Sequence, residues 1–136
     1  MASKKHKHPD ILRAFAEQVQ HCEAEACWPS TDWSDWPCTD WPLRLEIHHV
    51  MGGAHRIDAP WNLVRLCSSA HNWVTANPIE GRVLCWWILH QRGAFDCKAI
   101  HAATRIHPAG WIGAKQSDIR LPWVADLAGV LLEVSE

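Results

Sequence analysis

Three of the histidines and one of the asparagines in a single stretch of the chain, residues 45–77, have an order that suits hydrolysis. His48 and His49 are adjacent and end an alternating apolar run. Asn62 lies thirteen residues after His49, and His71 lies nine residues after Asn62. Neutral imidazoles bind divalent metal ions and, with an ordinary pKa of about 6.5, accept protons near neutrality. Phosphodiester hydrolysis needs both functions, because water must lose a proton while charge builds on the phosphoryl and leaving oxygens.

The residues around the histidine doublet predict two strands joined by a loop. Leu43 to Val50 alternates apolar and polar residues, and a second short apolar run, Leu63 to Cys67, lies within the expected partner strand of residues 62–67. Gly52 and Gly53 between the two runs favour a turn, and the loop continues to Pro60. The two runs are therefore expected to pair as an antiparallel hairpin.

A helix is expected to follow the second strand and to carry His71. Ser68 or Ser69 can cap its N-terminus, and the helix must end before Pro78. Successive side chains on a strand point to opposite sides. The two histidines of the doublet can therefore share one site only where the strand twists or ends between them.

The order of these motifs resembles the HNH endonuclease family of the ββα-metal nuclease superfamily. The resemblance rests on IHHV at residues 47–50, DAPWNL at residues 58–63 and the turn LCSSAH at residues 66–71. It implies an α+β fold with a small ββα-metal core at about residues 43–77. That core would be a two-stranded antiparallel hairpin plus a helix, with flanking helices around it.

The resemblance also implies a role for each residue of the pattern. His48 would be a metal ligand and His49 the general base, while His71 would complete the protein's share of the metal shell from the helix. Asn62 would orient the base or brace the loop between the strands through its amide. One divalent ion (Mg²⁺, Mn²⁺, Ni²⁺ or Zn²⁺) would clamp the scissile phosphate of DNA, and imidazole ligands favour the last three ions over Mg²⁺.

The sequence departs from the family pattern at two places. Some members carry a further histidine four residues after the last one, where this chain has Thr75, so water or a substrate oxygen would fill that position. Many members also hold a structural zinc between two cysteine pairs. Here the upstream pair is Cys22-x4-Cys27, and the downstream one begins at Cys67 but reads CSSA. Structural zinc sites use four ligands, so a structural zinc is not expected unless Cys38 restores the missing thiolate.

Length and composition predict one domain, residues 10–136, behind a flexible basic arm at residues 1–9. The chain has 136 residues, of which 48% are hydrophobic, enough for one packed core. Apolar periodicity predicts further helices at residues 10–21, 80–91 and 96–105. The last thirty residues contain two prolines and several glycines, and they are expected to form a loop followed by a short element at residues 123–134.

Charge and the absence of targeting signals predict the cellular location of the protein and its need for a partner. We expect a cytoplasmic protein with no membrane contact, because the sequence shows neither a secretory leader nor an apolar run of the roughly 20 residues that cross a bilayer. Its six cysteines are then thiols or metal ligands. The net charge of −2 is low for an enzyme that binds DNA phosphates, so a partner protein could supply DNA affinity.

The segment from residue 28 to residue 42 holds four of the ten tryptophans and three prolines. One interpretation has these indoles stacking on nucleic-acid bases. The favoured interpretation is a loop pinned to the core by its indoles, since three aspartates within the segment would repel phosphate. Both interpretations exclude a long helix here.

Three classes of function fit these observations. The first is a metal-dependent endonuclease that hydrolyses DNA phosphodiester bonds by a single-metal mechanism with a histidine base. The second is a catalytically weak HNH-fold protein that binds nucleic acid or assists phage packaging. The third is an interaction module stabilised by zinc. The combination of the doublet, the asparagine and the helical histidine favours the first.

Overall fold

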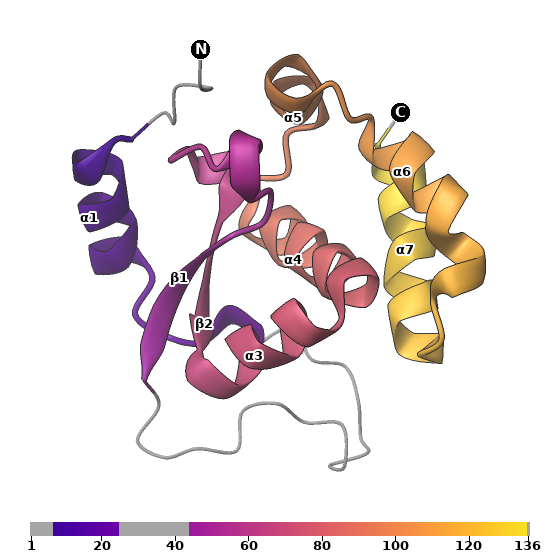
Figure 1. Ribbon diagram of the computed structural model, residues 1–136, viewed down its shortest axis with the longest axis horizontal. Coiled ribbons are helices and arrows are strands. Elements are labelled where there is room, and N and C mark those ends of the chain that lie inside the picture. Colours follow the sequence, from indigo (N-terminus) through magenta and orange to yellow (C-terminus); the bar gives the residue numbers. More distant parts are fainter. Residues whose placement is uncertain (1–6, 25–43, 136) are drawn as a thin grey trace.

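The computed structural model describes residues 7–24 and 44–135, which form an α+β fold (Figure 1). The predicted fold class is thus confirmed at this level: the described residues contain six α-helices and one two-stranded antiparallel sheet. In chain order, the elements are α1 (Pro9–Gln18), β1 (Leu45–His49), η2 (Gly53–His55), η3 (Pro60–Asn62), β2 (Leu63–Cys67), α3 (Ser68–Ala76), α4 (Pro78–Arg92), α5 (Cys97–Thr104), α6 (Pro108–Lys115), η4 (Gln116–Asp118) and α7 (Pro122–Val134).

The tryptophan-rich segment lies outside the described residues, and so do Cys27 and Cys38. The predictions for that segment and for the missing structural zinc therefore stay predictions. Of the cysteines in the predicted knuckles, Cys22 and Cys67 are described, and both are fully buried in the main apolar cluster.

The β-hairpin is covered on both faces. Strands β1 and β2 are antiparallel, with His48 opposite Val64 and His49 opposite Leu63. Val64 belongs to the main core, whereas Leu63 belongs to a second cluster with α1 residues such as Phe15. Residues directly opposite one another point to the same face of a sheet. His48 therefore lies on the face of the main core, and His49 lies on the face that α1 covers.

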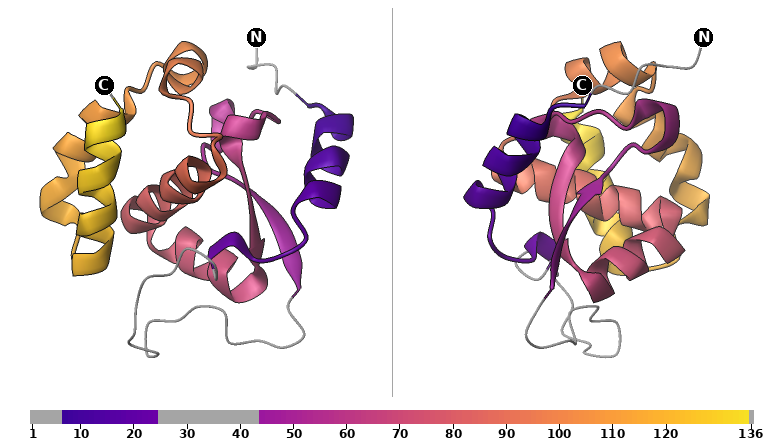
Figure 2. Two further views of the ribbon diagram at one scale, coloured as in Figure 1. Left: turned by 180° about the vertical axis from the view of Figure 1, so that it is seen from behind. Right: turned by 60° about the vertical axis from the view of Figure 1, so that its left-hand side comes forward.

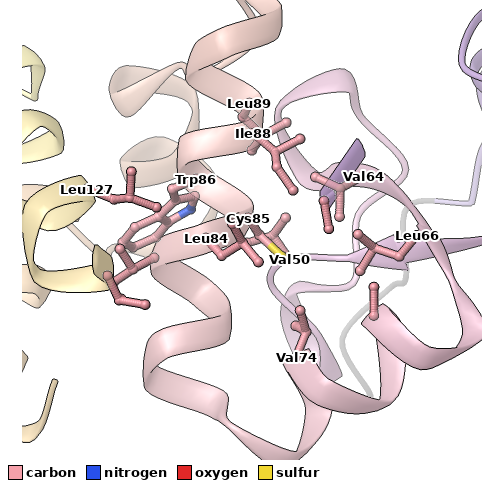
Figure 3. Packing of buried hydrophobic residues seen from close by; sticks show 14 of the residues in the cluster. Val50, Val64, Leu66, Val74, Leu84, Cys85, Trp86, Ile88, Leu89 and Leu127 are labelled. Carbon is pink, nitrogen blue, oxygen red and sulfur yellow. The ribbon is translucent and has the colours of Figure 1, made fainter. Parts of the chain in front are cut away.

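Helix α4 is the centre of the main core. It lies between the hairpin on one side and the α6–α7 pair on the other, as Figures 1 and 2 show. The helix is apolar around most of its circumference, and such a helix is stable when neighbouring elements on several sides shield its apolar side chains from water. Figure 3 shows the buried side chains that meet along it, among them Leu84, Trp86 and Ile88 from α4 itself, Val64 from β2 and Leu127 from α7.

Helix α1 packs on the hairpin with an apolar face that the sequence predicted. Phe15 and Val19 are buried against Leu63, and the apolar side chains of Ile11 and Leu12 lie beside them. The helix begins with proline at its first position, where the missing N–H costs no intrahelical hydrogen bond. It is shorter than the predicted helix of residues 10–21.

The C-terminal third is more helical than the sequence analysis predicted, and the expected loop was wrong. Residues 108–115 form α6, and α7 begins at Pro122 and runs to Val134. Both prolines stand at the first position of a helix, so they start helices here and break none. Burial of Ile112 in the core stabilises α6 in spite of its glycines.

The cap of α3 also differs from the prediction. Neither serine is the N-cap residue; Cys67 is, and its Sγ accepts a hydrogen bond from the backbone N–H of Ala70. A thiol is a weak acceptor, although full burial shields this hydrogen bond from water. Cys67 is also the last residue of β2, and α3 begins at the next residue, Ser68.

Helix length bears on the expectation of no membrane contact. The longest helix of residues 7–24 and 44–135 is α4, with 15 residues. None of the helices in these ranges has both the length and the apolar character that crossing a membrane requires.

The contact between α3 and α4 depends on a glycine. A Cβ atom at Gly81 would lie 2.6 Å from the carbonyl oxygen of Val74 and 2.9 Å from its Cα, so any side chain there forces the two helices apart. We predict that Gly81→Ala lowers the free energy of unfolding by about 1–3 kcal/mol. Chemical denaturation measures this change.

The matched control is Gly129→Ala in α7, where a Cβ atom meets nothing within 4 Å. Because alanine favours a helix over glycine by about 0.5–1 kcal/mol, this variant should be as stable as the original chain or more so. Equal stability of both variants would contradict the close packing of α3 on α4.

Candidate functional site

The candidate site lies where β1 ends. His48 and His49 are the last two residues of this strand, and both line a cavity of about 230 Å³ together with His71 from α3. The rest of its wall is formed by Ile47 of the strand and by Gly52, Gly53 and Arg56 of the loop after it. The end of the strand therefore brings the doublet to one cavity although successive strand side chains point to opposite sides.

His48 and His71 meet edge to face. Their ring centroids are 4.9 Å apart, with an angle of 68° between the ring planes. Burial lowers the pKa of His48 to about 4, and the neighbouring imidazoles and Arg82 act in the same direction. His48 is consequently neutral near pH 7, which is the form that binds a metal ion.

Glu46 holds the second imidazole of this pair. Its Oε1 lies 2.9 Å from Nδ1 of His71, and it stands two residues before His48 on the same face of β1. An ionised carboxylate can only accept hydrogen bonds, so Nδ1 of His71 carries the proton. In the neutral ring the lone pair of His71 is then on Nε2, the arrangement found where a carboxylate orients a metal-binding histidine.

His49 has different partners because it lies on the other face of the strand. Its Nε2 is 2.7 Å from Oδ1 of Asp58, and these two side chains are 9% and 8% exposed. The backbone N–H of His8 donates to the other oxygen of Asp58 over 2.9 Å. Burial alone would raise the pKa of Asp58, but the hydrogen bonds from His49 and His8 outweigh it, so this pKa lies below its ordinary value.

A second cavity adjoins the first. It has a volume of about 270 Å³ and is lined by Lys7, Pro9 and Leu12 from the N-terminal segment and by His49, Arg56 and Asp58. His49 and Arg56 line both cavities. The imidazole of His49 thus lies between a cavity that contains the two other histidines and one that is closed by residues just before and within α1.

Asn62 braces the loop between the strands. Its Oδ1 accepts from the N–H of Met51 over 2.7 Å, and its Nδ2 donates to the carbonyls of Met51, His55 and Ile57 over 3.0–3.3 Å. The side chain is fully buried, so all of its polar atoms are used by backbone groups of the loop. Gly53 helps the same loop to turn, with φ of 60°, a value that side-chain-bearing residues adopt only with strain.

The structure thus brings His48, His49 and His71 to one cavity and places Asn62 behind the loop that forms its wall. Sequence reasoning missed two carboxylates. Glu46 could have been found, since strand alternation puts it on the face of His48. Asp58 stood in the motif phrase, but its pairing with His49 depends on a loop conformation that periodicity does not encode.

Two of the imidazoles on this cavity, those of His48 and His71, could serve as donors to a metal ion. Within the described ranges, no three His, Cys, Asp or Glu side chains converge as a metal-binding group. Two imidazoles, from His48 and His71, would then be the protein's share, and water or phosphate oxygens would fill the remaining positions. Catalytic zinc sites combine three protein ligands with one open position, and structural ones are closed by four, so an ion held by two imidazoles would have one protein ligand fewer. At Thr75, where a further ligand could stand, the hydroxyl donates to the backbone carbonyl of His71.

Comparisons of this chain with protein-family models, with curated proteins and with solved structures found no match. The likeness to HNH endonucleases therefore rests on the motif residues of the sequence.

The four hydrogen bonds of Asn62 predict a large effect on stability. Asn62→Ala leaves buried backbone groups of the loop without partners, at a cost of about 1–3 kcal/mol for each group that water does not reach. We expect the free energy of unfolding to fall by at least about 2 kcal/mol and amide exchange at Met51 to accelerate. Denaturation and hydrogen exchange measure the two effects.

Asn72→Ala is the matched control, because Asn72 is exposed on α3. Its stability should stay within about 0.5 kcal/mol of the original value. Similar stability of the Asn62 and Asn72 variants would show that the loop keeps its shape without the buried amide.

Proposed function

We propose that the protein is a metal-dependent endonuclease of the HNH family, with β1, β2 and α3 as its ββα-metal core. The proposal depends on one observation: the ring centroids of His48 and His71 are 4.9 Å apart, and both rings line the cavity that His49 also lines. The substrate would be DNA, and the reaction would be hydrolysis of a phosphodiester bond with one metal ion.

The first cavity contains the candidate metal ligands. His48 is kept neutral by burial, and Glu46 selects the tautomer of His71, so each ring would offer a lone pair to an ion in this cavity. A divalent ion held by these two imidazoles would polarise the phosphodiester and neutralise charge on the leaving oxygen. Imidazole donors favour Mn²⁺, Ni²⁺ or Zn²⁺, and Mg²⁺ would be held more weakly.

His49 would be the general base. It lies next to a metal ligand in sequence and lines the same cavity, so a water molecule there can reach both the base and the phosphate. A positioned base of suitable pKa contributes about 10²–10⁴-fold to the rate. Asn62 acts at a distance, by fixing the loop that carries the opposite wall of the cavity.

Arg56 is the candidate phosphate contact. It is exposed and lines both cavities. Its guanidinium could therefore contact the backbone of a DNA strand that passes from the first cavity to the second. Lys7 adds a second exposed cation at the second cavity. Two cations give limited DNA affinity, so the proposal includes a partner protein that supplies the rest.

The net charge of −2 also favours one alternative. The same fold could serve as a catalytically weak nucleic-acid-binding or packaging accessory protein, whose partner provides most of the affinity. A plasmid-nicking assay with Mg²⁺, Mn²⁺ or Zn²⁺ separates the two functions, because only the endonuclease converts supercoiled DNA to nicked or linear forms.

The metal assignment predicts which variants lose metal. Calorimetry with Mn²⁺ should find one site, and His48→Ala or His71→Ala should abolish it, because each removes one of two imidazole ligands. Glu46→Gln should weaken the site by about 10–100-fold through loss of orientation. His101→Ala, at a histidine of α5 that stacks on His107, is the control and should bind as before. Unchanged affinity in both ligand variants would remove the metal from this cavity.

The base assignment predicts loss of cleavage with retention of metal. His49→Asn keeps a donor for Asp58 but has no group that accepts a proton near neutral pH, so the nicking rate should fall by about 10²-fold or more while Mn²⁺ affinity is unchanged. His21→Ala, at an exposed residue outside both cavities, should cleave normally. Full activity of folded His49→Asn would show that another group is the base.

A further inference from the structure

We propose that Asp58 is the positioning residue of His49: it holds the proton of the neutral ring on Nε2 and leaves the lone pair of Nδ1 as the proton acceptor. We infer in addition that the segment before α1 takes part in the site, because the backbone of His8 holds the same carboxylate. The catalytic consequence rests on the proposed function, whereas the tautomer does not.

The geometry of the pair carries the first part. Oδ1 of Asp58 lies 2.7 Å from Nε2 of His49, and both side chains are nearly excluded from water, at 8% and 9% exposure. A short hydrogen bond between buried partners is protected from competition by solvent. The ring of His49 is therefore fixed by one specific partner and does not rotate freely in the cavity.

The chemistry of a carboxylate decides which nitrogen is protonated. Ionised Asp58 has only acceptor atoms, so the nitrogen that faces it must carry the hydrogen. In the neutral ring the other nitrogen, Nδ1, then has the lone pair. The same logic explains why a buried aspartate beside a catalytic histidine selects a tautomer and stabilises the imidazolium that forms, without itself taking the proton.

The proton balance of the step follows. Nδ1 of His49 takes one proton from the attacking water as the water oxygen bonds to phosphorus and the bond to the leaving oxygen breaks. The leaving oxygen takes a proton from solvent, and the imidazolium later returns its proton to solvent. Asp58 stays ionised throughout and offsets the positive charge that His49 acquires.

The second oxygen of Asp58 connects the site to the N-terminal segment. The N–H of His8 donates to Oδ2 over 2.9 Å, across fifty residues of sequence, so the carboxylate is held from both sides. His8 immediately precedes α1, which packs on the hairpin through Phe15 and Leu63. Residues expected to belong to a flexible arm therefore form part of the support of the candidate base.

A purely structural clamp is the alternative to a positioning role. Such a clamp would tie the loop to α1, and its loss would lower stability without changing the ring nitrogen that carries the proton. The tautomer therefore distinguishes the two roles. Cleavage alone would not, because a loosened loop also slows the reaction.

The test is ¹⁵N NMR of the histidine ring nitrogens in the full-length, metal-free protein at about pH 8.5, where an ordinary imidazole is neutral. We expect His49 to be protonated on Nε2. In Asp58→Asn, the amide can donate to Nε2, so the proton should move to Nδ1. The nicking rate should fall by about 10²–10⁴-fold, while Mn²⁺ affinity stays unchanged. Asp126→Asn, at an exposed aspartate of α7, should change neither.

Two outcomes would overturn the proposal: a proton on Nδ1 of His49 in the original chain, or an unchanged tautomer in folded Asp58→Asn. If that variant does not fold, the tautomer of the original chain still decides between the two nitrogens. The two proposals can also be separated. If the proton lies on Nε2 and moves in Asp58→Asn, but the protein nicks no DNA with any metal, the positioning role is supported and the proposed function is rejected.

Discussion

A partly buried ion pair between Glu23 and Arg92 joins the parts of the chain that build the candidate site. The carboxylate of Glu23 is 6% exposed, and besides Arg92 it accepts a hydrogen bond from the backbone N–H of Arg65 in β2. Arg92, from the end of α4, donates to the carbonyl of Leu63 and lies 4.9 Å over the ring of Phe15. Burying two charges is costly unless each is fully paired, so this pair is stable only where the segment after α1, β2 and α4 all meet.

That constraint places the hairpin between two covering layers, and strand alternation then divides the histidine doublet. His48 lies on the face of α3 and α4, where its ring meets that of His71 and burial lowers its pKa. His49 lies on the face of α1, where it meets Asp58. One face therefore brings together the two imidazoles that are the proposed metal ligands, and the other holds an imidazole whose orientation is fixed. A buried amide, Asn62, holds the loop that closes the cavity between them.

Much of this arrangement could be predicted where it is local in sequence. The hairpin and α3 follow from periodicity, and the three histidines were expected to converge at the strand end. The helices that begin at Pro108 and Pro122 were not fully predicted, because proline breaks a helix in its interior but starts one at its first position. The contact of Asp58 with His49 and His8 also escaped prediction. It joins loop, strand and N-terminal segment, and such pairing depends on tertiary packing that no local pattern encodes.

The central claim is that His48 and His71 hold one metal ion on the cavity that His49 lines. Anomalous diffraction from crystals soaked in Zn²⁺ tests it most directly, because the metal is then located without reference to activity. The predicted result is an anomalous peak about 2.0–2.1 Å from one imidazole nitrogen of each of these two histidines, with Nε2 as the ligand atom of His71. A fully loaded crystal with no peak between the two rings would contradict the account.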